Sequence, residues 1–239
     1  MNRQVLLVLG AGLALFGCST ACATTAGLAP EADSDSCIGP RTARAFVVYL
    51  HGVDSPEPGP LEQQNREALT RAGQALSIRF ALPRATQACG NGTVCWGPTG
   101  DRPQRQAAAQ ATLEAASRCF PPKAKYGVLG FSSGGYLVLR WLRACEFPTE
   151  LPRVEWSVAV GSSMLRGALE RTPEDLSRCG RVTLFNGTRD GSNDPDGNYL
   201  KQLEAKRADV SLVEYPGGHE LPGEALIDLL ARHVAISRR

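Results

Sequence analysis

YGVLGFSSGGYLVLRWLRA occupies residues 126–144 and is typical of a strand, a sharp turn and a helix in succession. The short apolar run at 126–131 indicates a strand buried on both faces, and a longer helical pattern follows it. Between them stands G-x-S-x-G, formed by Gly130, Ser132 and Gly134. In this context the string predicts a nucleophile elbow, because its glycines let the backbone turn tightly around an exposed Ser132 hydroxyl.

The same alternation of strand and helix continues on both sides of this stretch. Short apolar runs occur at 45–50, 77–82, 156–161, 181–186 and 210–215. Helical patterns occur at 61–76, 104–119, 196–207 and 224–236. Continuous runs such as FVVYL suit strands that are covered on both sides. We therefore predict one α/β domain at 43–239, with a mostly parallel sheet of about six strands and helices on both faces.

A serine nucleophile needs a base, and the chain has three histidines. His219 follows the last predicted strand, on a loop that can bring an imidazole over the carboxyl edge of the sheet. His51 ends the first predicted strand, and His233 lies inside the last predicted helix, where a structural role is expected. We predict that His219 is the base; an inert surface-loop position is the alternative.

The base in turn needs a carboxylate to orient it. The predicted strand VTLFN ends shortly before Asp190, at the sheet edge where the catalytic groups of open α/β sheets collect. Asp194 and Asp196 are rivals, but the sequence D-P-D at 194–196 is typical of a helix start with Asp194 as its N-cap. Asp190 is therefore the predicted acid.

The order Ser132, Asp190, His219 resembles that of the α/β-hydrolase superfamily. The chain is most similar to its small, lidless serine hydrolases, which are dienelactone-hydrolase-like and carboxylesterase- or acyl-thioesterase-like. The resemblance extends over about 45–239 and rests on the segments VVYLHG, GFSSGGY, FNGTRD and YPGGHE. It implies a single-domain α/β-hydrolase fold, with Ser132 as nucleophile, His219 as base and Asp190 as acid.

The resemblance also implies where a negatively charged tetrahedral oxygen would be bound. Its oxyanion hole would be formed by the backbone N–H groups of Val53, after the matching His51-Gly52, and of Ser133. His51 would then hold the loop and transfer no proton. Dienelactone hydrolases proper have cysteine at the elbow, whereas this chain has serine, so their substrate class is not implied.

Two loops at the predicted catalytic edge concern the substrate. Residues 162–180 number only 19 (180 − 161), which leaves no room for a lid domain and favours soluble or exposed esters over triglycerides at an interface. In the loop at 84–103, Cys89 and Cys95 could close a small ring, with Trp96 pointing toward the pocket as a substrate wall; a plain surface loop is the alternative. No residue identifies the acyl or the alcohol group.

Composition excludes several classes of function. The chain has 239 residues, of which 43% are hydrophobic and 21% charged, as in a globular protein rather than a disordered or fibrous one. Its net charge of +2 gives no field for binding nucleic acid. No apolar run reaches about 18 residues, so a protein with several membrane spans is excluded. The histidines lack metal-ligand spacing, and we expect neither a metal nor a cofactor.

The N-terminus predicts export. Arg3 precedes a short apolar stretch, which is typical of a signal peptide occupying 1–23. The sequence LFGC resembles a lipobox ending at Cys18, whereas ACA at 21–23 suits ordinary cleavage, and both stay open. A lipid on Cys18 would be the only expected membrane attachment, and the protein would lie in the bacterial periplasm or cell envelope, or be secreted. Residues 24–42, rich in small and polar residues, are predicted to be a linker.

Six cysteines remain after ordinary cleavage, and an oxidising compartment allows all of them to pair. One pair encloses a Gly-Asn-Gly turn, so a local ring forms easily. In a right-handed α/β crossover, the other four cysteines lie at the amino-terminal edge of the sheet. The predicted bonds are Cys89–Cys95, Cys145–Cys179 and Cys37–Cys119.

Together these inferences predict an exported serine hydrolase that cleaves a small-molecule or polymer carboxylic ester through an acyl-enzyme on Ser132. A peptidase or a polyester depolymerase would use the same groups. A non-catalytic envelope-binding protein on a hydrolase fold is an alternative of a different class, because fold alone implies no activity. Labelling by a fluorophosphonate probe distinguishes that alternative from the enzymes.

Overall fold

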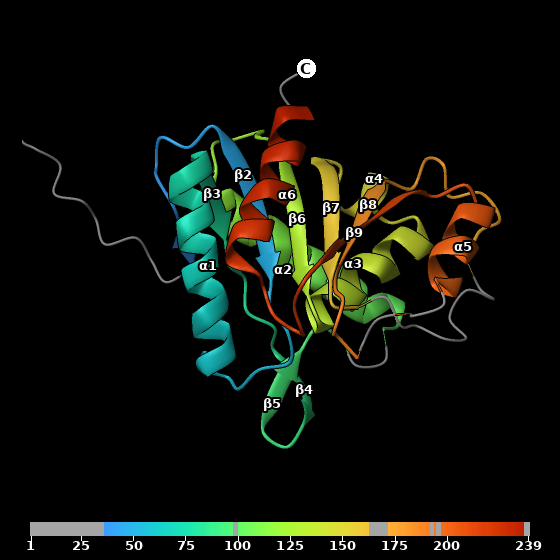
Figure 1. Ribbon diagram of the computed structural model, residues 1–239, viewed down its shortest axis with the longest axis horizontal. Helices are drawn as coiled ribbons and strands as arrows, with labels where there is room; N and C mark the ends of the chain where they lie inside the picture. Colours follow the sequence, from blue (N-terminus) through green and yellow to red (C-terminus); the bar gives the residue numbers. More distant parts are fainter. Residues whose placement is uncertain (1–35, 98–99, 163–171, 192–193, 195–196, 237–239) are drawn as a thin grey trace, which may run out of the picture. The chain divides into compact units, whose positions relative to one another are not determined.

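The computed structural model describes residues 36–97, 100–162, 172–191, 194 and 197–236 (Figure 1). All of them belong to one compact unit, which spans Asp33–Arg239. The predicted signal peptide and the first part of the predicted linker lie outside the described residues. In the described part of the chain, no helix is both long enough and apolar enough to cross a membrane.

A seven-stranded sheet forms the centre of this unit, in the order β1-β3-β2-β6-β7-β8-β9. The six longer strands are parallel, and β1 pairs antiparallel with β3. The strands are β1 (Cys37–Ile38), β2 (Ala45–Leu50), β3 (Ile78–Ala81), β6 (Tyr126–Phe131), β7 (Val154–Val160), β8 (Arg181–Gly187) and β9 (Asp209–Tyr215). Because the chain winds outward from β2 in one direction and from β6 in the other, the switch point lies between these two strands. Open α/β sheets bind ligands at such a point, outside the carboxyl ends of the strands.

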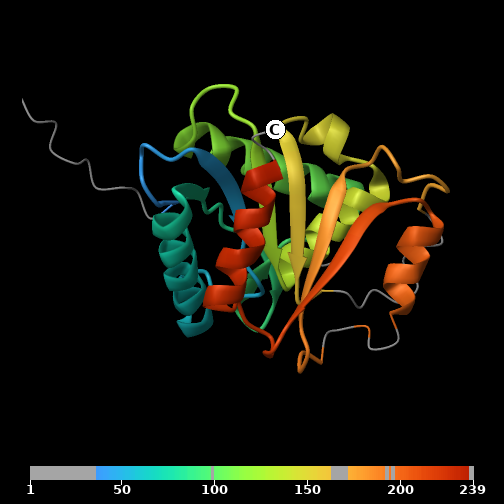
Figure 2. The same ribbon diagram turned by 45° about the horizontal axis from the view of Figure 1, so that its top comes forward.

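Helices cover both faces of the sheet, as predicted. One face, in front in Figures 1 and 2, is covered by α1 (Pro60–Leu76) and α6 (Gly223–Ile236). The other face is covered by α2 (Arg102–Cys119), α3 (Ser133–Ala144) and α5 (Asn198–Ala205). Each face has its own apolar core, in which leucines of the helices are fully buried against the strands. Burying one such side chain stabilises the fold by about 2 kcal/mol, so the two layers fix the strand ends that present the site.

The six predicted strands and five predicted helices are confirmed, with bounds that agree within two residues. Three short features were not predicted: β1, the hairpin formed by β4 (Gln87–Gly90) and β5 (Thr93–Cys95), and α4 (Phe147–Glu150). Elements of two to four residues are too short to show a hydrophobic period. Because β1 lies within the segment 24–42, where a linker was expected, residues from Cys37 onward belong to the folded domain.

Three disulfides join the described cysteines in the predicted pairing. They are Cys37–Cys119, Cys89–Cys95 and Cys145–Cys179, with sequence separations of 82, 6 and 34 residues. Cys145 caps the end of α3 and Cys179 stands just before β8, so that bond lies at the amino-terminal edge of the sheet. The bond in the hairpin lies instead at the edge where the strands end.

Candidate active site

Ser132 stands between the last residue of β6 and the first residue of α3. Its backbone has φ 51° and ψ −111°, a conformation that a side-chain-bearing residue rarely adopts. Such strain persists only where the surroundings enforce it, and here the Ser132 N–H donates to Val160 O at 2.8 Å. The predicted elbow is therefore present in the backbone.

The glycines of the elbow are required by close packing. A Cβ on Gly130 would lie 2.3 Å from the carbonyl oxygen of Gly134, and a Cβ on Gly134 would lie 2.1 Å from the carbonyl oxygen of Leu50. Both distances are far below van der Waals contact, so any larger residue would push α3 away from the sheet. The motif thus brings the start of α3 directly against the end of β2.

Asp190 and His219 form a hydrogen-bonded pair, although 29 residues separate them in the chain. His219 Nδ1 donates to Asp190 Oδ2 at 2.8 Å. The Asp190 side chain is 2% exposed and that of His219 is 38% exposed, so the carboxylate is shielded while the imidazole reaches the surface. Because an ionised carboxylate only accepts, the neutral imidazole carries its proton on Nδ1 and leaves Nε2 as an acceptor.

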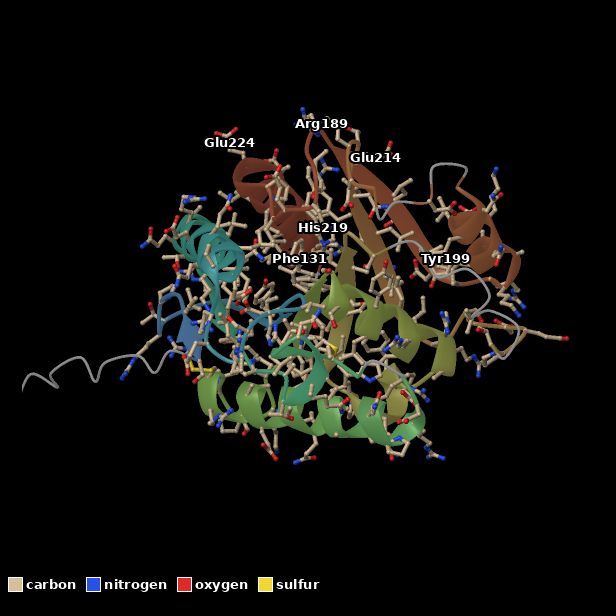
Figure 3. The ribbon with its side chains drawn as sticks, turned by 90° about the horizontal axis from the view of Figure 1, so that it is seen from below. Phe131, Arg189, Tyr199, Glu214, His219 and Glu224 are labelled. Atoms are coloured by element: carbon tan, nitrogen blue, oxygen red, sulfur yellow. A yellow bond between two sulfur atoms is a disulfide. The ribbon has the colours of Figure 1, made fainter. Side chains whose placement is uncertain are left out.

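This pair lies beside the elbow. The ring of Phe131, the residue before Ser132, is 4.9 Å from the imidazole of His219, centroid to centroid. Figure 3, seen from the edge where the strands end, shows Phe131 and His219 next to each other. The structure therefore brings the three predicted residues Ser132, Asp190 and His219 to the same edge of the sheet.

Backbone hydrogen bonds join the loop of Asp190 to the loop of His219. Thr188 N–H donates to Tyr215 O at 2.9 Å, and Arg189 N–H donates to Gly217 O at 2.8 Å. These bonds continue the pairing of β8 with β9 beyond the strands. The acid and the base are consequently carried by one hydrogen-bonded unit and not by two independent loops.

Tyr215 also holds the loop of His219 through its side chain, which the sequence analysis missed. Its hydroxyl donates to the carbonyl oxygens of Gly218 and Glu220, at 3.0 and 2.7 Å, and these residues flank His219. Burial, followed by the charge of Asp190, raises the pKa of Tyr215 above its usual range, so the phenol keeps its proton. No pattern distinguishes this tyrosine from any other apolar residue at a strand end.

Gly161, directly after β7, was missed as well. It has φ +58°, and a Cβ there would lie 2.8 Å from both Asp190 Oδ2 and His219 Nδ1. Glycine is therefore the residue that lets the backbone approach the acid–base pair this closely. A glycine at a strand end is a weak signal, because turns use the same residue.

Two backbone N–H groups are expected in the oxyanion hole: that of Val53 in the segment after β2, and that of Ser133 at the start of α3. Val53 is 55% exposed. Within the described part of the chain, neither the Val53 N–H nor the Ser133 N–H donates a hydrogen bond. The Ser133 N–H is the first of α3, where the helix dipole favours negative charge. Both groups are thus available for a ligand oxygen.

His51 holds this segment and is not exposed to substrate. The imidazole is 1% exposed; Nδ1 donates to Gly52 O at 2.6 Å, and Nε2 accepts from the Ala85 N–H at 3.0 Å. Burial lowers the pKa of His51 to about 4, so the ring is neutral. His233 is likewise buried, stacked on Trp156, with a pKa lowered to about 4 by burial. Both histidines have the structural positions that were expected.

Trp96 does not have the position expected of a substrate wall. The residue is 4% exposed, and its indole Nε1 donates to His51 O at 2.9 Å. Its backbone N–H donates to Ser133 Oγ at 3.1 Å. A buried tryptophan with its N–H satisfied is a packing residue. Trp96 therefore supports the loops of the site from behind, because its ring turns into the core instead of toward the surface.

Two further expectations concern residues around the site. Asp194 was predicted to be an N-cap residue, but the N-cap of α5 is Gly197; the Asp194 carboxylate nevertheless accepts the Tyr199 N–H in the first turn of that helix. The expected absence of a lid depends on the connection between β7 and β8, where residues 163–171 lie outside the described residues. That expectation stays a prediction.

Comparisons with known proteins give structural matches. No family model and no curated protein matches the chain. Among solved structures, acyl-protein thioesterase 2 from Zea mays has a TM-score of 0.57 at 18% identity, covering 84% of this chain and 96% of that one. A carboxylesterase from Mesorhizobium loti has a TM-score of 0.55 at 21% identity, covering 81% and 89%. An uncharacterized protein from Bacillus cereus has a TM-score of 0.57 at 14% identity; it covers 83% of this chain, which spans 61% of its length.

At identities this low, the likeness concerns the path of the backbone. The sheet order, the parallel pairing and the elbow between β6 and α3 agree with that likeness. The chain has the α/β-hydrolase fold.

Proposed function

We propose that this protein is an exported serine hydrolase that cleaves carboxylic esters through an acyl-enzyme on Ser132. The observation that supports it most is the 2.8 Å hydrogen bond between His219 Nδ1 and a buried Asp190, at the sheet edge that also carries the strained Ser132. With its proton on Nδ1, the neutral imidazole has Nε2 as the nitrogen that can accept a further proton. Activation of a hydroxyl nucleophile requires an acceptor of this kind.

In the first half-reaction, Ser132 Oγ attacks the ester carbonyl carbon while its proton passes to His219 Nε2. The carbonyl oxygen becomes negatively charged, and the N–H groups of Val53 and Ser133 donate to it. The bond to the alcohol oxygen then breaks, the imidazolium returns the proton to that oxygen, and the alcohol leaves. Asp190 stays ionised and stabilises the imidazolium that forms in between.

In the second half-reaction, water replaces the alcohol. His219 Nε2 takes a proton from the water as its oxygen attacks the acyl carbon, and the oxyanion is bound by the same two N–H groups. The bond to Ser132 Oγ breaks, the serine regains its proton, and the carboxylic acid is released. No step requires a metal or a cofactor.

The identity of the acid is tested by comparing two nearby aspartates. Asp190→Asn is expected to lower kcat on p-nitrophenyl acetate by about 10⁴-fold, because the amide favours the wrong tautomer of His219. Asp194→Asn is the matched control, since Asp194 caps α5; it should lower stability by about 1 kcal/mol or less and leave kcat within about twofold. The reverse pattern would assign the acid to Asp194, and unchanged kcat in both variants would contradict the triad.

Export is supported by the three disulfides, which suit an oxidising compartment. The first test is the N-terminal sequence of the mature protein. Cleavage after Ala23 indicates a protein without a lipid, and a lipidated N-terminal Cys18 indicates a lipoprotein. An uncleaved Met1 in protein recovered from the cytoplasm would contradict export.

A further inference from the structure

The segment 51–54, which includes the Val53 N–H, is held at its start by residues of the loop that follows β3. His51 Nε2 accepts the Ala85 N–H at 3.0 Å, and His51 O accepts the indole N–H of Trp96 at 2.9 Å. Ala85 and Trp96 are themselves buried. The imidazole and the carbonyl group of His51 are therefore both held by hydrogen bonds from the stretch of chain between β3 and α2.

The end of the segment is held by the hairpin itself. Asp54 and Val94 of β5 exchange two backbone hydrogen bonds, Asp54 N–H to Val94 O at 3.1 Å and Val94 N–H to Asp54 O at 2.7 Å. Both terminal nitrogens of Arg84 bond to Asp54 Oδ2, each at 3.1 Å. The carboxylate is 11% exposed, so this ion pair is stronger than a typical surface pair. Val53 consequently lies between two anchored residues.

The same stretch of chain also contacts the second proposed oxyanion donor. Trp96 N–H donates to Ser133 Oγ at 3.1 Å, and the guanidinium of Arg140 in α3 donates to Gly97 O. Residues 94–97 therefore connect the segment of Val53 to the first turns of α3. Gly134 N–H also donates to His51 O at 3.1 Å, so residues 94–97 add to a direct contact between the two segments, and their movement would loosen the distance between the two oxyanion donors.

The hairpin is buried at its base, at Cys95 and Trp96, but its tip has little packing to keep it ordered. Its strands have four and three residues, and Ala88, Gly90, Asn91 and Gly92 are exposed. A two-stranded hairpin of this size is marginally stable in water. Figure 1 shows β4 and β5 extending from the edge at which β2 ends. The Cys89–Cys95 bond closes the hairpin directly beside Val94 and Trp96 and thus ties its more exposed strand to its more buried one.

We propose that the hairpin β4–β5 is a positioning element of the oxyanion hole. The Cys89–Cys95 bond then raises kcat by keeping the N–H groups of Val53 and Ser133 at a fixed distance from each other. The inference rests on the proposed hydrolase function and adds a role for residues that touch no substrate. A catalytic group displaced by about 1 Å can cost on the order of 10²-fold in rate. The other two bonds lie away from this edge and have no such role.

The test compares two variants of the full, exported chain, each lacking one of the three disulfides. In Cys89→Ala/Cys95→Ala, we expect kcat on p-nitrophenyl acetate to fall tenfold or more, with KM changed less than twofold. The control is Cys145→Ala/Cys179→Ala. Its cysteines are 34 residues apart in sequence, against 6 for the hairpin pair, so removing this bond lowers the free energy of unfolding more. Its kcat is expected to stay within twofold at a temperature where both variants are folded.

A second measurement reports on the oxyanion hole itself. A trifluoromethyl ketone forms a hemiketal with Ser132, whose oxyanion needs the same two N–H donors as the transition state. In the Cys89→Ala/Cys95→Ala variant its inhibition constant should rise by about the factor by which kcat falls, and the control should bind it as wild type does. A greater loss of kcat in the control would indicate a stability effect and overturn the proposal. An active wild type with unchanged kcat in the hairpin variant would overturn the role of the hairpin and leave the hydrolase function intact. An inactive wild type would overturn both proposals.

Discussion

Gly161→Ala is expected to disrupt the acid–base pair without touching either member. The new Cβ would lie 2.8 Å from Asp190 Oδ2 and from His219 Nδ1, whereas ordinary contact begins at 3.4 Å. One or both groups must therefore move by about 0.6 Å (3.4 − 2.8). A displacement of this size predicts a fall in kcat of about tenfold to a hundredfold, because proton transfer depends steeply on geometry.

The substitution also forces alanine into a left-handed conformation, at φ +58°, which costs about 1 kcal/mol of stability. Gly197→Ala is a matched control for that cost. Gly197 has φ +63°, and a Cβ there would have no atom within 4 Å. Both variants should lose stability in urea unfolding, Gly161→Ala the more because of its close contacts, but only Gly161→Ala should lose turnover on p-nitrophenyl acetate. Equal kcat values in the two variants would refute the reasoning.

Three other changes test separate parts of the structure. Tyr215→Phe removes the hydroxyl that holds both sides of His219 while keeping the ring, and should lower kcat about tenfold with KM unchanged; unchanged kcat would make the contact dispensable. The pKa of His233 is lowered from 6.5 to about 4, so between these values the unfolded chain binds a proton that the folded one does not, and stability falls as the pH drops from 6.5 toward 4. Between pH 6.5 and 5 this loss is about 2 kcal/mol, and a His233→Gln variant should lose that much less over the same interval; an identical slope would contradict a buried neutral imidazole. Replacing Cys37 and Cys119 by alanine should lower the unfolding free energy by about 4 kcal/mol, given their sequence separation of 82, and leave kcat unchanged in the folded protein; a large kcat loss would contradict their separation from the site.

The features that could be predicted from sequence follow either from local patterns in the chain or from the general geometry of parallel sheets. A continuous apolar run such as 126–131 predicts a buried strand, and glycines flanking Ser132 permit the sharp turn that follows it. The Asp190–His219 contact could be predicted because parallel strands bring their carboxyl ends to one edge, so a residue after β8 and a residue after β9 lie near each other. The Cys145–Cys179 pair follows from the same rule applied to the opposite edge, whereas the Cys89–Cys95 pair follows from the turn that it encloses.

The features that could not be predicted depend on contacts between distant segments. A loop tryptophan can turn outward or inward, and Trp96 turns inward because the carbonyl of His51 offers its N–H a partner. The role of Tyr215 depends on the path of the loop after β9, and a hydrophobic periodicity in the sequence does not predict that path. The need for glycine at 161 arises only when β7 ends beside the assembled acid–base pair. Two-residue β1 is set by its pairing with β3 and by the bond to Cys119.

The most direct test of the central claim is covalent labelling by a fluorophosphonate, followed by peptide mapping. The serine oxygen attacks the phosphorus, fluoride leaves, and the adduct marks the nucleophile. We predict a single adduct on the peptide that contains Ser132 and no labelling of Ser132→Ala, with circular dichroism showing that the variant is folded. An adduct on another residue, or labelling that persists in Ser132→Ala at the wild-type rate, would contradict Ser132 as the nucleophile.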